Sequence, residues 1–112
     1  VRATGTVTAH YSDDRLKTNK VNIPNALDKV GNLNGFTYNP NEVATALGFI
    51  DEKQVGVSAQ EVEAVLPEAV VLADAVNADH GTDYKTVQYS KLVPLLIEAI
   101  KELEARIATL EG

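Results

Sequence analysis

The sequence predicts an α+β domain in which short strands and hairpins alternate with small helices, and a C-terminal helix ends the chain. Short β-branched and aromatic stretches are separated by Gly, Pro and Asn, which is typical of short strands joined by turns. Ser58 followed by Glu61 matches the capping box of a short helix. At the end of the chain, apolar residues recur every three or four positions, as they do along one stripe of a longer helix.

The elements are expected in a regular order along the chain. Residues 1–11 suit an extended strand or an incoming linker, and residues 12–17 suit a polar turn. Asn34-Gly35 is a tight-turn dipeptide before a strand. We further expect strands over 36–38, 54–57, 69–72 and 84–89, short helices over 24–30, 42–47 and 58–66, and an exposed loop over 73–83.

Composition excludes several functions. The 112 residues suffice for one domain, and the net charge of -6 disfavours binding to nucleic acid or to an anionic membrane. Without cysteine the chain forms no disulfide or thiolate metal site, and we expect no cofactor. Alanine and valine supply much of the apolar fraction whereas aromatic residues are few, so association with identical copies would help to bury apolar surface.

The clearest periodic signal is a coiled-coil seam in a helix expected over about 90–111. All six a and d positions of the repeat are apolar, namely Val93, Ile100 and Ile107 at a and Leu96, Leu103 and Leu110 at d. Ser90 is a suitable N-cap, and Glu102 stands four residues before Arg106 in the order that favours an ion pair. This choice of a and d residues favours a coiled coil of two helices without excluding one of three. The alternative is a helix that packs its stripe on its own domain.

Ser12 and Lys17 are the pair with a possible mechanism. A serine hydroxyl becomes a nucleophile when a base takes its proton, and a neutral lysine amine can be that base. Residues five apart face different directions on a strand or a helix, so the two side chains meet only if the chain turns between them. Asp13-Asp14 supplies a turn but favours a charged lysine, and Arg15 is a candidate to neutralise one aspartate. By spacing alone, a solvated turn is the commoner arrangement.

Other polar residues give weaker signals. The Asp79–Asp83 segment around His80 has oxygen and nitrogen donors but neither the ligand spacing of a calcium loop nor a second histidine for zinc. It is interpreted as a polar turn, so no metal site is predicted. His10 is interpreted as an ordinary strand residue, with assistance to Ser12 as the alternative.

The order of these segments resembles the intramolecular chaperone domain of phage tail spikes, tail fibres and endosialidases. The resemblance covers about residues 12–110. It rests on the stretches Ser12–Lys17, Ile23–Leu27, Gly35–Tyr38, Gly56–Val62, Leu66–Val70 and Val87–Lys101.

The resemblance implies a fold, an assembly and a reaction. The C-terminal helix would form a parallel trimeric coiled coil that brings three chains into register, with two copies of itself and the upstream fibre as partners. The domain would be a single-turnover serine peptidase that cuts the Tyr11–Ser12 bond, with Ser12 as nucleophile and Lys17 as general base. Residues 1–11 would then end the upstream fibre, and residues 12–112 would be the chaperone domain.

The expected location is the virion, after assembly in the host cytoplasm. Since the sequence lacks an initiator methionine, we expect Val1 to lie within a longer polypeptide. Two alternatives stay open. One is a non-cleaving trimerisation cap that remains on the virion and touches the host surface through residues 73–83. The other is a coiled-coil oligomerisation module without chemistry.

Overall fold

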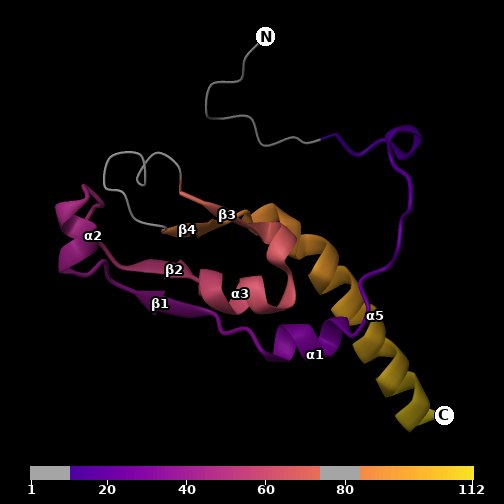
Figure 1. Ribbon diagram of the computed structural model, residues 1–112. Coiled ribbons are helices and arrows are strands. Elements are labelled where there is room, and N and C mark those ends of the chain that lie inside the picture. Colours follow the sequence, from indigo (N-terminus) through magenta and orange to yellow (C-terminus); the bar gives the residue numbers. More distant parts are fainter. Residues whose placement is uncertain (1–10, 74–83) are drawn as a thin grey trace.

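The computed structural model describes residues 11–73 and 84–112, which form small helices, short strands and a long C-terminal helix (Figure 1). The helices are α1 (Ala26–Gly31), α2 (Glu42–Ala46), α3 (Ala59–Val65) and α5 (Leu92–Glu111), and 3-10 helices occupy Asp14–Leu16, Pro67–Ala69 and Tyr89–Lys91. The strands are β1 (Phe36–Tyr38), β2 (Gln54–Gly56), β3 (Val70–Leu72) and β4 (Lys85–Val87). The predicted mixture of helices and small strands is confirmed.

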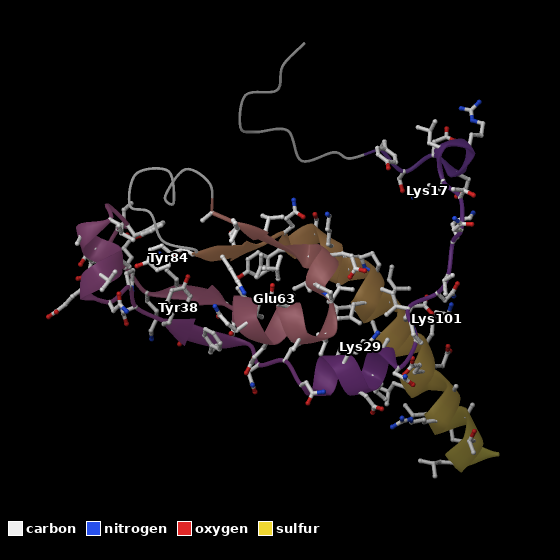
Figure 2. All side chains as sticks on the ribbon, in the orientation of Figure 1. Lys17, Lys29, Tyr38, Glu63, Tyr84 and Lys101 are labelled. Carbon is white, nitrogen blue, oxygen red and sulfur yellow. The ribbon has the colours of Figure 1, made fainter. Side chains whose placement is uncertain are left out.

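The strands form two separate antiparallel pairs. In one, β1 pairs with β2 and places Phe36 opposite Gly56; in the other, β3 pairs with β4 and places Val70 opposite Val87. An ion pair between Glu63 of α3 and Lys85 of β4 joins α3 to the second sheet (Figure 2). Neither sheet is wide enough to form a core by itself, so their stability depends on the helices packed beside them.

The start of α3 agrees with the prediction only in part. The Ser58 hydroxyl accepts a hydrogen bond from the Glu61 main-chain N–H at 3.3 Å, as a capping box requires. The Glu61 carboxylate instead accepts from the main chain and side chain of Asn34, at 3.2 and 3.1 Å. The predicted tight turn at Asn34-Gly35 is therefore wrong, because this segment is held against α3 rather than folded back on itself.

The long helix begins later than predicted. Ser90 lies in the 3-10 helix Tyr89–Lys91, and α5 starts at Leu92 with Lys91 as its N-cap. Ser90 is therefore not the cap, since the chain is already turning where the capping residue was expected to be extended. Pro94 is the third residue of α5 and lies in its first turn, where a missing N–H costs no helical hydrogen bond.

A small core joins α1 to α5. Leu95 and Ala99 of α5 are buried against Ala26 of α1. Further apolar side chains pack around this cluster, namely Ile23, Leu27, Val30, Leu33 and Leu66. One face of α5 is thus covered by α1 of the same chain, as Figure 1 shows.

Some predictions fall on residues that the structure does not describe. They are the strand or linker over 1–10 with His10, most of the loop over 73–83, and the polar turn around His80. These predictions lie outside the described residues.

Candidate functional site

The two side chains that the sequence singled out for chemistry are in contact. The Lys17 ammonium nitrogen donates to the Ser12 hydroxyl oxygen at 2.8 Å. This distance allows a proton to pass between the two groups. The peptide bond between Tyr11 and Ser12 is next to the hydroxyl in the chain, so the hydroxyl, the amine and this bond lie in one short segment.

A 3-10 helix brings Ser12 and Lys17 together. Asp13 caps this helix, and its carboxylate accepts from the Arg15 main-chain N–H at 2.9 Å. The N–H groups of Leu16 and Lys17 donate to the carbonyls of Asp13 and Asp14, at 3.0 and 3.1 Å. One tight turn therefore reverses the chain between residues that would point apart on a strand.

The acidic residues of this turn are bound to cations other than Lys17. The Arg15 guanidinium donates to both carboxylate oxygens of Asp13, at 3.0 and 2.8 Å. These side-chain bonds, with the bond from the Arg15 main chain and a smaller contribution from Lys17, hold the pKa of Asp13 below its usual range. Asp14 pairs with Lys20 at 3.3 Å. Pairing reduces the pull of both carboxylates on a charged Lys17.

The turn lies apart from the rest of the domain. Ser12 and Lys17 are exposed, and the Tyr11 side chain is 75% exposed. Figure 2 shows Lys17 on a segment that stands clear of both sheets. A lysine serves as a general base near neutral pH only where water is excluded from its amine, and the exposed position of Lys17 in the single chain does not exclude water.

The second candidate feature is the outer face of α5. All six predicted seam residues are at least 45% exposed in the single chain, whereas Leu95 and Ala99 on another face are buried. The alternative that the stripe packs on its own domain is therefore wrong, because α1 covers a different face of the helix. Ile97, at 51% exposed, lies next to the seam and widens the apolar surface in its first part.

Sequence reasoning missed one residue, Glu102, that joins α5 to α1. The two Glu102 carboxylate oxygens accept from the main-chain N–H groups of Ala26 and Leu27, at 2.7 and 2.9 Å. Asn25 at the start of α1 provides no side-chain cap, and Glu102 takes that role. The sequence predicted an ion pair between Glu102 and Arg106, and it did not indicate these hydrogen bonds to α1. No local pattern could have indicated it, because Ala26 is 76 positions away.

The link between Glu102 and α1 is expected to weaken in acid. The hydrogen bonds from Leu27 and Ala26, aided by the charges of Arg106 and Lys29, lower the pKa of Glu102 from its ordinary 4.5. A lowered folded-state pKa gives stability that is fully present above the ordinary value and is lost as the pH falls through the folded-state value. The stability difference between the parent and Glu102→Gln should therefore shrink as the pH falls below 4.5. Thermal unfolding at a series of pH values measures it, and a pH-independent difference would contradict the prediction.

The described residues contain neither a candidate metal centre nor a candidate membrane-spanning helix. Within residues 11–73 and 84–112, no three histidine or acidic side chains gather as they would around a metal ion. None of the helices there has the length and apolar character needed to cross a membrane.

Comparison with known proteins identifies the family. A family model described as chaperone of endosialidase matches residues 12–71, more than half of the chain, and the match begins at Ser12. The long tail fiber protein Gp37 of Enterobacteria phage K3 is 42% identical over 101 residues, which are 90% of this chain and 8% of that protein. Gp37 of phage T2 is also 42% identical, over 90% of this chain and 7% of its own length.

A shorter relative gives the same result. Gp37 of Enterobacteria phage M1 is 40% identical over 101 residues, which are 89% of this chain and 38% of that protein. The chain thus spans well under half the length of these relatives. The resemblance inferred from the motifs is confirmed, and this chain belongs to the chaperone of endosialidase family.

Proposed function

We propose that this chain is the C-terminal intramolecular chaperone of a phage tail fibre or tail spike. Three copies associate through α5, bring the upstream fibre strands into register, and then release themselves by cutting the Tyr11–Ser12 bond. The observation that carries the proposal is the exposed seam, since all six of its apolar residues lack cover in a single chain. The relatives are tail fibre proteins by name, which supports a fibre as the upstream partner.

The number of copies rests on the family together with the width of the apolar stripe. Valine or isoleucine at a with leucine at d would by itself favour two helices. Ile97 extends the exposed stripe beyond the a and d positions, and a wider apolar face suits packing with more than one neighbour. Joining the C-terminal tails raises the local concentration of the upstream strands to roughly millimolar, which lowers the entropic cost of their alignment.

The proposed cleavage uses only groups of the turn and water. Lys17, once neutral, takes the proton of the Ser12 hydroxyl, and the hydroxyl oxygen attacks the carbonyl carbon of Tyr11. The Tyr11–Ser12 carbon–nitrogen bond breaks, the Ser12 nitrogen receives the proton, and an ester joins Tyr11 to the serine oxygen. Water then hydrolyses this ester, which leaves a carboxylate on Tyr11, restores the hydroxyl of Ser12 and releases one proton that the new Ser12 amine takes up.

Assembly provides a reason for cleavage to wait until the trimer forms. In the single chain Lys17 is exposed to water. A neighbouring copy or the folded fibre would exclude water from the amine and favour its neutral form. After release, the fibre cannot easily refold once it unfolds, and its stability becomes kinetic.

Mass spectrometry and sedimentation of the full-length fibre protein test the proposal. We expect trimers and a released C-terminal fragment whose first residue is Ser12. Trimers without that fragment would identify a cap that stays attached to the fibre, and would overturn the cleavage. Dimers or monomers would overturn the proposed assembly.

A further inference from the structure

We propose that Glu102 is a positioning residue for the self-cleavage: by holding the start of α1 on the helix that forms the seam, it transmits assembly to the Ser12–Lys17 turn. This inference rests on the proposed function. It concerns how two separate features, the seam and the cleavage turn, act together.

The segment between the turn and α1 is attached to α5 at successive points. The Asn22 side-chain amide donates to Glu98 at 3.3 Å. Ile23 packs against the cluster of Ala26, Leu95 and Ala99. The N–H groups of residues 26 and 27 then donate to Glu102. Glu102 accepts two of these hydrogen bonds, at 2.7 and 2.9 Å, the shortest of the set.

Glu102 also stabilises a backbone arrangement that α1 cannot stabilise alone. Asn25 has a φ of 53°, a left-handed conformation that residues other than glycine rarely adopt, although asparagine tolerates it better than most. Its side chain makes no capping bond to the first turn of α1. The Glu102 carboxylate supplies the missing acceptor, so its removal leaves two N–H groups unpaired and the left-handed residue unsupported.

These attachments limit how far the cleavage turn can move from α5. Between Lys17 and Asn22 the chain can span at most about 18 Å, five residues at roughly 3.5 Å each. Release of the attachments over 22–27 would lengthen the free segment between the turn and α5. It would therefore lower the effective concentration of the turn at its position in the assembly. Glu98 and Glu102 stand on the same rigid helix as the seam, so zipping the seam fixes where the turn lies relative to neighbouring copies.

The test compares Glu102→Ala, Glu102→Gln and the matched control Glu104→Ala in the full-length protein. Among the described residues, Glu104 makes no ion pair or hydrogen bond through its side chain, and it is exposed on the same helix. Because Glu104 lies one heptad after Ile97, beside the seam, the cleavage rate of Glu104→Ala is compared only within isolated trimers. Trimers of each variant are isolated, and appearance of the fragment that begins at Ser12 is timed. Hydrogen exchange of the Ala26 and Leu27 amides reports the attachment itself.

We expect Glu102→Ala to form trimers, to lose protection at both amides and to cleave about tenfold more slowly or worse, because displaced reacting groups react slowly. Glu102→Gln keeps one acceptor oxygen and should recover part of the rate, whereas Glu104→Ala should match the parent. A parental rate in Glu102→Ala trimers whose amides have lost protection would overturn the inference and leave the proposed function intact.

Two other results are decisive as well. If Glu102→Ala does not fold, Glu102→Gln decides, and a parental rate despite lost protection at either amide overturns the inference. If parental trimers release no fragment, the proposed cleavage fails, and the positioning role fails with it.

Discussion

Replacing Lys17 with alanine is expected to abolish release of the fragment that begins at Ser12 while leaving the amount of trimer unchanged. The Lys17 nitrogen is the base proposed for the Ser12 hydroxyl, at 2.8 Å, and loss of a general base typically slows a reaction by about 10²- to 10⁴-fold. Lys17 is exposed and lies far along the chain from the seam, so assembly should not depend on it. Timed mass spectrometry measures the release, and sedimentation measures the trimer.

Two further variants separate a base from a positive charge. Lys17→Arg keeps the charge but cannot supply a neutral amine, so it should be as slow as Lys17→Ala. Lys53→Ala removes an exposed lysine that precedes β2 and does not belong to the turn, and it should cleave normally. Cleavage before Ser12 by Lys17→Ala at the parental rate would show that Lys17 is not the base.

The second large effect is expected from charges placed in the seam. Ile100→Asp combined with Ile107→Asp should convert trimers to monomers, because each buried carboxylate costs several kcal/mol. In the single chain these two side chains are 65% and 47% exposed, so the fold of each copy should survive. Sedimentation measures the assembly, and far-ultraviolet circular dichroism checks that the helices persist.

A matched charge elsewhere on the helix provides the control. Ala105 is exposed on α5 outside the a and d positions, so Ala105→Asp should leave the trimer nearly unchanged. Loss of the seam should also stop release of the fragment, because the proposed exclusion of water from Lys17 requires a neighbouring copy. Fragment release from monomers at the parental rate would refute the coupling between assembly and cleavage.

The sequence predicted structure well where residues close together in the chain determine the local backbone conformation. The strands over 36–38 and 70–72 follow from short apolar or aromatic stretches bounded by Pro, Gly or Asn. Ser58 caps α3 because its hydroxyl accepts a hydrogen bond from the main-chain N–H of Glu61, only three residues later. The apolar stripe of α5 follows from a repeat that any helix turns into one face. The prediction failed at Ser90, where a second local structure was possible. Ser90 lies in a 3-10 helix that precedes α5 and does not act as the N-cap of α5.

The cleavage turn is an intermediate case. A spacing of five residues does not bring two side chains together on a regular helix or strand, and the sequence indicated only that a turn could lie between them. The bonding of Asp13 to Arg15 selects a 3-10 turn, and the pairing of Asp14 with Lys20 leaves Lys17 to the Ser12 hydroxyl. Which cation pairs with which carboxylate is a matter of geometry rather than order along the chain.

By itself the sequence indicated the family, the order of the elements and the six apolar residues that form one stripe along α5. Only the tertiary structure decided that the seam stays uncovered in a single chain, because α1 occupies a different face of α5. It also decided the role of Glu102, whose partners are 75 and 76 positions away. A repeat of apolar residues can be recognised from neighbouring positions in the sequence. A contact between residues far apart in the chain forms only after the helices have packed.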